Sequence, residues 1–570
     1  MHLIRRYAIM GGVILFLMAL LFVFRNFTTR MTEVNLFRGA ELAEEVFYPM
    51  MADSVNDQEI KLLIGGNTYS SLSMPLYMDE KLELMIPVES LRDSFHCSAR
   101  VYDENLLRLM KYNREADFPL DEEGYFLNDE YIDDTPGHVR TGGGLYVPVR
   151  EVTESFGGEY RFDMETNTAE VTGNEEGVPF YPTKFSLYEQ KCGPEVRKQG
   201  DQDTCWAFAA VSGLESTLKP EESIVFSANH MVQQNEFAAE PEDGGEYTMS
   251  MAYLLGYQGP VTEAQDPYGA ESSEGISPVK HVQEIQIIDS KNLEGIKEAV
   301  FLYGGVQSSI YNDLRNKDSE SPYYNRNTNS YCYIGTAKPN HDILIVGWDD
   351  DYPKENFPEE LEGNGAFLCL NSWGKGFGDD GLFYISYYDT NIGIHNVVYT
   401  GIESINNYDH LYQTDQCGWV GQIGYGQETA YGANVYTTNG AEELSAIGFY
   451  ATGHGTAYEL FLVHDFQSVE DLQHMESVAS GTLGNAGYYT IRLDKPVKLD
   501  ENESYAVVVG VTTPGSDRPL AVEYQADRLT QDVNLSDGQG YISMNGRFWD
   551  DIENEHACNL CLKAYTKEMH

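Results

Sequence analysis

The run Gln199-Gly200-Asp201-Gln202-Asp203-Thr204-Cys205-Trp206-Ala207-Phe208 opens an apolar helix with a thiol, six residues after a glutamine. No proline follows until Lys219-Pro220, so the sequence predicts a helix over 205–218, with Asp203 or Thr204 as its cap. Unpaired N–H groups and partial positive charge at a helix N-terminus favour thiolate over thiol. A lone cysteine is most often an inert buried residue, so a nucleophile is predicted only if the chain also supplies a base.

Two later segments supply candidate partners for this thiol. His341 and Asp342 lead into the apolar run 343–346, which is typical of a strand, and Gly347 is expected to turn the chain at its end. Asn371 follows a second apolar run and precedes Ser372-Trp373-Gly374. The spacing is 136 residues from thiol to imidazole and 30 from imidazole to amide. A base and a group that could orient it are therefore both available.

These segments resemble the papain-like cysteine peptidases over about residues 180 to 400. The order and spacing of the motifs fit that family. Four motifs carry the resemblance: Gln199, Cys205-Trp206-Ala207-Phe208, Asn340-His341 with a Val-Gly-Trp strand end, and Asn371-Ser372-Trp373-Gly374. The resemblance implies a multi-domain α+β protein in which a papain-like domain over 177–402 has a helical lobe and a β-barrel-like lobe.

The resemblance also implies roles for individual residues. Cys205 would be the nucleophile, His341 the general base, and Asn371 the residue that orients the imidazole. Gln199 would donate to the oxyanion together with the Cys205 backbone N–H. The chemistry needs no cofactor and no metal.

Substrate binding is implied for Trp373 and for a glycine pair. Gly244-Gly245 resembles the pair along which a substrate backbone aligns in this family, because glycines without Cβ atoms allow close approach. An ordinary acidic turn is the alternative interpretation of these glycines. The expected ligands are protein or peptide substrates.

Three departures from the family pattern affect the expected site. Gln202 stands where the family has a cysteine, so the usual disulfide of this loop is not expected. Asp203 places an anion beside the thiol, which should raise its pKa. Asp342 follows the histidine, and alternation along a strand predicts that it faces away from the imidazole. The acidic insertion 349–362 is predicted to be a solvated surface loop.

Length and charge indicate an exported protein with several domains. The 570 residues suggest three to four domains. With 37 basic and 90 acidic residues the formal charge is −53, so nucleic acid and anionic lipid are poor partners. The eight cysteines are scattered, and the pair Cys558 and Cys561 lacks the second pair of a zinc site.

The N-terminus is predicted to be a membrane anchor over 1–30, followed by a linker over 31–59. Tyr7 to Phe24 is apolar and uncharged, and at ~1.5 Å per residue it just spans a hydrocarbon core. A cleaved signal peptide is the alternative, but no small-residue cleavage site follows. We therefore expect a single-pass cell-membrane protein whose catalytic part is extracellular, with secretion after cleavage as the alternative.

Residues 60–176 contain an internal repeat. The segment 85–95 recurs as 146–156, and each copy predicts a strand followed by a short helix that begins at Pro-Val. The pattern resembles the copper amine oxidase N-terminal-like domain of bacterial surface proteins, without a metal site. A spacer, an envelope-binding module and an unusual propeptide are the functional alternatives.

Residues 403–570 read as short strands separated by Gly, Asn and Asp turns, which predicts an antiparallel β-sandwich. This part resembles the lectin-like domain that accompanies clostridial-type papain-like peptidases. The resemblance implies carbohydrate or cell-envelope contact. Trp419 and Trp549 are candidates to stack on a ligand, although buried tryptophans are common in sandwiches.

The whole sequence predicts a membrane-anchored extracellular cysteine endopeptidase. One alternative is a cell-wall amidase or transpeptidase that uses the same thiol. Another is a surface adhesin with an inactive papain-like domain. Intact Gln199, Cys205, His341 and Asn371 favour the peptidase.

Overall fold

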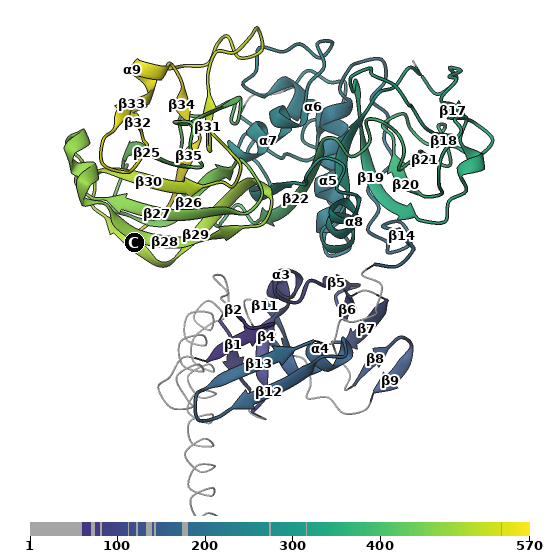
Figure 1. Cartoon of the computed structure of the whole chain (residues 1–570), viewed down its shortest axis with the longest axis horizontal. Coiled ribbons are helices and arrows are strands. Elements are labelled where there is room, and N and C mark those ends of the chain that lie inside the picture. Colours follow the sequence, from purple (N-terminus) through teal and green to yellow (C-terminus); the bar gives the residue numbers. More distant parts are fainter. Residues whose placement is uncertain are drawn as a thin grey trace, which may run out of the picture. The chain divides into compact units, whose positions relative to one another are not determined.

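The computed structural model describes residues 60–569 apart from gaps at 70–74, 80–81, 112, 121–123, 133–138, 142–143, 174–180, 273–274, 315 and 537. The predicted anchor, the signal-peptide alternative and the linker lie outside the described residues. Among the described helices, none is both long enough and apolar enough to cross a bilayer. The chain divides into two compact units, residues 1–99 with 114–177 and residues 100–113 with 178–570 (Figure 1).

The first unit contains a strand-then-helix element twice. β4 (Leu84–Pro87) leads through the 3-10 turn η3 (Val88–Ser90) into α3 (Leu91–Phe95), and β11 (Gly144–Pro148) leads into α4 (Val149–Ser155). β4 and β11 pair antiparallel, so the two copies meet along their strands. Both copies therefore fold in the predicted order, while the resemblance to the copper amine oxidase N-terminal-like domain stays a prediction.

Further strands between residues 60 and 172 are β1 (Lys61–Ile64), β2 (Asn67–Tyr69), β3 (Tyr77–Met78), β5 (Ser98–Tyr102), β6 (Leu106–Lys111), β7 (Arg114–Pro119), β8 (Tyr125–Leu127), β9 (Glu130–Ile132), β10 (Val139–Thr141), β12 (Glu159–Asp163) and β13 (Thr168–Thr172). β1 pairs parallel with β13 and antiparallel with β2. This sheet joins the two ends of the repeat, since β1 precedes the first copy and β13 follows the second.

The helix predicted at the thiol has the predicted bounds. α5 runs Cys205–Leu218, with Lys219 as its C-cap. The prediction of a side-chain cap is wrong, because the Thr204 hydroxyl makes no cap bond and lies 2.7 Å from the Tyr268 hydroxyl. α5 packs against α6 (Ala228–Gln233) and α7 (Tyr247–Leu255), and their buried apolar side chains form one core.

The strand β19 (His341–Asp349) organises the sheet beside these helices. It pairs antiparallel with β16 (Val306–Ile310), β20 (Ala366–Leu370) and β14 (Lys184–Ser186). The apolar side chains of these strands share a second core with α8 (Leu293–Leu302). Further strands here are β15 (His281–Ile287), β17 (Tyr324–Asn325), β18 (Ser330–Tyr331), β21 (Leu382–Ser386) and β22 (Asn396–Glu403).

The expected turn at Gly347 is not present. Gly347 lies inside β19, where the register with β20 shifts between Ile345 and Gly347. A Cβ at this position would run into the carbonyl oxygen of Phe185 in β14. Glycine therefore allows the close approach of a third strand rather than a turn.

The acidic insertion is a surface loop that is held to the domain by three buried side chains. Tyr352, Phe357 and Leu361 are buried in a small apolar cluster, on either side of the 3-10 turn η4 (Lys354–Asn356). Most of the charged residues between them are exposed or half-buried, as predicted for a solvated loop.

Residues after 403 form an antiparallel β-sandwich. One sheet has the order β28-β27-β30-β25-β32-β33, and β29, β26, β35 and β23 face it. Ile447, Leu460 and Val507 belong to the core between the sheets. The elements are β23 (His410–Tyr412), β24 (Gly421–Ile423), β25 (Thr429–Thr437), β26 (Glu442–Ala451), β27 (Thr456–Val463), η5 (Val469–His474), β28 (Glu476–Leu483), β29 (Ala486–Leu499), β30 (Ser504–Thr512), β31 (Leu520–Glu523), β32 (Gly540–Ser543), β33 (Asp550–Asp551), α9 (Ile552–His556), β34 (Asn559–Leu560) and β35 (Leu562–Glu568).

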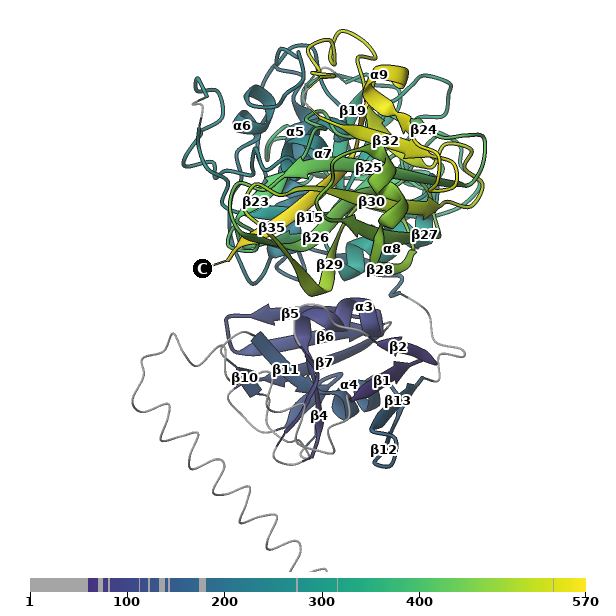
Figure 2. The same ribbon diagram turned by 90° about the vertical axis from the view of Figure 1, so that its left-hand side faces the viewer.

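The sandwich is continuous with the sheet beside the thiol helix. β15 pairs antiparallel with β29, and Figure 2 shows both beside β26 and β35. A single sheet therefore extends from β17 through β19 and β15 to β23. Tyr450, Tyr488 and Ala521 of the sandwich lie in the same core as Trp206 and Val211 of α5. The two parts therefore share main-chain hydrogen bonds and buried apolar surface.

This continuity predicts that residues 178–570 unfold together. The substitution Ile447→Ala, at a fully buried position of the sandwich, should cost about 2–5 kcal/mol and should also destabilise α5. Calorimetry should show one lowered transition for this unit, and hydrogen exchange should show faster exchange of α5 amides. The exposed Lys495→Ala is the control. Two separate transitions, with α5 protected as before, would contradict the prediction.

Candidate active site

Cys205 is the first residue of α5 and lies against β19. The backbone N–H of Asp342 is 3.4 Å from the Cys205 Sγ. The thiol is half-buried, while Trp206 behind it is almost completely buried. The packing of α5 on β19 therefore places the predicted nucleophile at the residue that follows His341.

His341 and Asn371 form the predicted pair. His341 Nε2 is 2.9 Å from Asn371 Oδ1, and both side chains are buried. The Ser372 backbone N–H also donates to this Oδ1 at 2.8 Å, which identifies the atom as an acceptor. His341 Nε2 is thus the donor, so in the neutral ring Nδ1 carries the free electron pair. The centroid of the Trp373 ring lies 5.4 Å from that of the imidazole, and Trp373 itself is half-buried.

Gln199 is fixed between the thiol loop and the Asn371 segment. Its backbone N–H donates to the Ser372 carbonyl at 2.8 Å, and its side-chain oxygen accepts from the Ser372 hydroxyl. Its side-chain Nε2 donates to the Gln202 carbonyl at 2.7 Å. An amide nitrogen carries two N–H groups, so the bond to Gln202 uses one and leaves a second for a ligand.

The loop before Cys205 is held by a tyrosine that the sequence did not single out. The Tyr268 hydroxyl lies 2.8 Å from the Gln199 carbonyl, 3.0 Å from Gln202 Oε1 and 2.7 Å from Thr204 Oγ1. Cys192 and Cys205, the described cysteines nearest this loop in sequence, form no disulfide. The tyrosine hydroxyl therefore braces a loop that contains no disulfide. Local sequence around Tyr268 signals only a turn, so nothing in it points to this contact.

Gly244 and Gly245 lie beside the nucleophile loop. A Cβ at Gly245 would be 2.5 Å from the Trp206 indole, and a Cβ at Gly244 would be 3.8 Å from Asp203. Gly244 has a φ of +76°, which other residues rarely adopt. The pair therefore lies beside the loop that carries the thiol. The Trp206 indole leaves no room for a side chain at position 245.

Burial dominates the electrostatics of the thiol and the imidazole. The pKa of Cys205 is raised to about 12, first by burial and then by the Asp342 carboxylate, whereas the N–H groups of Asp342 and Trp206 lower it. Burial also lowers the pKa of His341. The helix N–H group therefore acts on the thiol in the predicted direction, but burial outweighs it and favours the neutral thiol and the neutral imidazole in the free site.

Asp203 and Asp342 are the two acidic residues beside the thiol, and both affect its pKa. Asp203 raises the pKa of both Cys205 and His341. The Asp342 carboxylate accepts from Ser309 Oγ and Gln307 Nε2, each at 2.7 Å, on the neighbouring strand β16. These contacts agree with the prediction that Asp342 faces away from the imidazole. Its buried charge nevertheless acts on the thiol.

Comparison with known proteins identifies the two domains. Residues 181–402 match the family described as papain family cysteine protease, and residues 411–566 match the lectin like domain. Cathepsin S of Bos taurus is 29% identical over 209 residues, which cover 35% of this chain and 58% of the cathepsin. Cathepsin S of Mus musculus is 27% identical over 246 residues, which cover 40% and 64%. This chain therefore spans less than two thirds of the length of these relatives.

Two solved structures resemble both domains together. The clostridial cysteine protease Cwp84, with a C116A substitution and after propeptide cleavage, is 25% identical with a TM-score of 0.61, and the match covers 68% of this chain and 99% of that one. The cysteine protease and lectin-like domains of Cwp84, a surface layer associated protein of Clostridium difficile, are 25% identical with a TM-score of 0.60. That match covers 68% of this chain and 89% of the other.

The chain therefore contains a region similar to the papain family of cysteine proteases, followed by a region similar to the lectin like domain, in the predicted order.

The substitution Asp342→Asn tests the charge beside the thiol. Removal of the anion should lower the pKa of Cys205, because Asp342 now raises it. The pH midpoint for alkylation of Cys205 by iodoacetamide should move down by roughly one pH unit. Asp349→Asn, at the far end of the same strand, is the control and should leave the midpoint unchanged. An unchanged or raised midpoint in Asp342→Asn would contradict the prediction.

Proposed function

We propose that this chain is a cysteine endopeptidase that hydrolyses peptide bonds in proteins at the cell surface. The proposal rests on the convergence of Cys205, His341, Asn371 and Gln199 within a papain-family domain. In it, Cys205 is the nucleophile, His341 the general acid and base, and Asn371 the residue that orients the imidazole.

The proposed reaction begins from the neutral pair. Cys205 Sγ attacks the carbonyl carbon of the peptide bond while its proton passes to His341 Nδ1. The oxyanion accepts hydrogen bonds from the Cys205 backbone N–H, which has no partner inside its helix, and from the second N–H of Gln199. Loss of one such donor typically lowers turnover by ~10²–10³.

The second half of the reaction restores the thiol. The protonated His341 gives its proton to the departing amine, and the acyl group remains on sulfur as a thioester. Water then loses a proton to His341 and attacks the thioester, and collapse of the intermediate releases the acid and the Cys205 thiolate, which takes the proton back from His341. Asn371 holds the ring throughout without changing its own charge.

The substrate backbone is proposed to lie along Gly244 and Gly245, with Trp373 beside the departing group. The position of the glycine pair against Trp206 and Asp203 supports this assignment. The contact of Trp373 with the imidazole supports its placement beside the departing group.

We place the enzyme outside the cell, because Cwp84 is described as a surface layer associated protein. A single-pass N-terminal anchor, or secretion after signal cleavage, would deliver it there. The N-terminal repeat module is then a spacer or an envelope-binding module. Two rival functions are a cell-wall amidase or transpeptidase and an inactive surface adhesin. The hydrogen bonds that hold Gln199 in place support neither of these rivals.

Replacement of the nucleophile tests the function directly. Cys205→Ala should abolish cleavage of a denatured protein substrate and of labelled peptides, with the thermal transition unchanged. An epoxide that traps activated thiols should modify Cys205 of the unaltered chain and no residue of the variant. Residual peptidase activity in Cys205→Ala would contradict the assignment. Release of amine groups from purified cell wall, without peptide cleavage, would favour the amidase.

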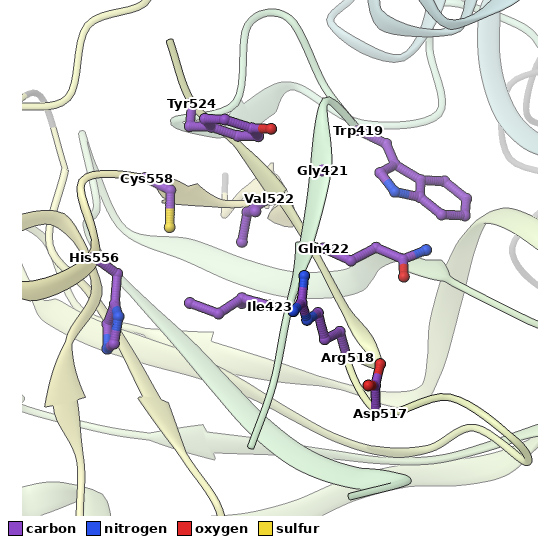
Figure 3. A pocket seen from close by; sticks show the side chains of 10 residues that line it. All are labelled: Trp419, Gly421, Gln422, Ile423, Asp517, Arg518, Val522, Tyr524, His556 and Cys558. Atoms are coloured by element: carbon purple, nitrogen blue, oxygen red, sulfur yellow. The ribbon is translucent and has the colours of Figure 1, made fainter. Parts of the chain in front are cut away.

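A second proposed function belongs to the lectin-like domain, where a cavity of about 610 Å³ is suited to a carbohydrate. Its lining combines aromatic faces with hydrogen-bonding side chains, the combination that sugars require. Figure 3 shows its lining residues, including Trp419, Tyr524, Gln422, Asp517, Arg518 and His556. The Tyr524 ring packs over Gly421 and is 38% exposed, so its face is available for stacking.

The substitution Tyr524→Ala tests the cavity. Binding to N-acetylglucosamine oligomers and to isolated cell-wall polysaccharide should weaken roughly three- to tenfold, as expected for loss of one aromatic contact. Phe548→Ala is the matched control, since Phe548 is a 79% exposed aromatic outside the cavity lining. Equal binding by Tyr524→Ala and the unaltered chain, measured by calorimetry, would exclude this cavity as the site.

A further inference from the structure

A loop of the lectin-like domain touches the segment that leads into the glycine pair. The Ala238 backbone N–H donates to the Leu529 carbonyl at 2.8 Å, and Arg528 Nη1 donates to the Ala238 carbonyl at 2.9 Å. Arg528 Nη2 also lies 2.8 Å from the carboxylate of Asp243. Asp243 immediately precedes Gly244. Three contacts thus connect residues 528–529 to residues 238–243.

The loop that makes these contacts is held by its own hydrogen bonds. The Leu529 N–H donates to Asp527 Oδ1 at 2.8 Å, and the Ala526 N–H donates to Thr530 Oγ1 at 2.8 Å. Thr530 is buried. These bonds therefore hold the main chain of the loop, including the residues that carry the Leu529 carbonyl and the Arg528 side chain.

The segment that receives the contacts lacks regular structure of its own. It lies between the end of α6 at Gln233 and the start of α7 at Tyr247. Within it, the Glu240 N–H donates to the Asp243 carboxylate at 2.8 Å, so the carboxylate that meets Arg528 also closes the turn before Gly244. The position of this turn determines where Gly244 and Gly245 lie relative to Trp206.

We propose that the lectin-like domain forms part of the substrate-binding apparatus, with Arg528 as a positioning residue. This inference rests on the proposed peptidase function. Arg528 and Leu529 hold the turn 240–243 so that the main chain of Gly244-Gly245 faces an extended substrate. The lectin-like domain is then required for productive peptide binding, independently of any glycan that it binds.

The exposure of the ion pair makes the proposal testable without unfolding the protein. The side chains of Arg528 and Asp243 are 55% and 33% exposed, and ion pairs of this kind contribute little to global stability. A change in kinetics after substitution of Arg528 will therefore report on the turn rather than on the fold.

The test compares kcat and KM of Arg528→Ala and the unaltered full chain, with an internally quenched peptide long enough to cross the whole cleft. KM should rise roughly three- to tenfold, with kcat nearly unchanged, because the turn binds the substrate and does not touch the reacting atoms. The thermal midpoint should not change. Arg547→Ala, an exposed arginine elsewhere in the domain, is the control.

A double-mutant cycle completes the test. Asp243→Asn should raise KM by no more than Arg528→Ala does, and the double variant should show no loss beyond that of Arg528→Ala, because that substitution already removes the contact with Asp243. An unchanged KM in Arg528→Ala, or additive losses in the double variant, would overturn the inference. If the unaltered chain cleaves no peptide, the proposed function itself fails, so the two failures are distinguishable.

Discussion

The contact between the first turn of α5 and the first residues of β19 is the constraint on which the site depends. It brings the Cys205 Sγ to 3.4 Å from the Asp342 N–H, so the thiol and His341 are neighbours although 136 residues separate them. The pairing of β19 with β20 then brings Asn371, one residue beyond the end of β20, to the imidazole. The site is therefore assembled by the packing of α5 on β19 and by the pairing of β19 with β20.

Features of the site that have a local sequence signal were predictable. The bounds of α5 follow from a run without proline that Lys219-Pro220 ends, and the place of Asn371 follows from the end of an apolar strand. The repeat in residues 85–156 was also readable, because strand and helix recur with the same short motif. In each case the determining residues lie next to one another in the chain.

Features that depend on distant partners were not predictable. Thr204 has the side chain of a cap, but Tyr268 takes its hydroxyl, and Gly347 has the signature of a turn, but a third strand needs its missing side chain. Composition likewise separated the sandwich from the peptidase domain, whereas β15 and β29 join them. The edge of a strand can form the same main-chain hydrogen bonds with many other strands. Sequence pattern alone therefore does not predict which strand it pairs with.

The acidic residues around the thiol act on both partners of the proton transfer. An ion pair of thiolate and imidazolium predominates at rest only where the thiol pKa lies below the imidazolium pKa, and burial moves the two pKa values in the opposite sense. Asp203 raises both pKa values, so its charge does not reverse their order. Burial opposes either charge alone, but proton transfer from Cys205 to His341 creates no net charge. Burial therefore favours the neutral resting pair, while Asp203 favours the imidazolium that forms when the thiol gives its proton to His341.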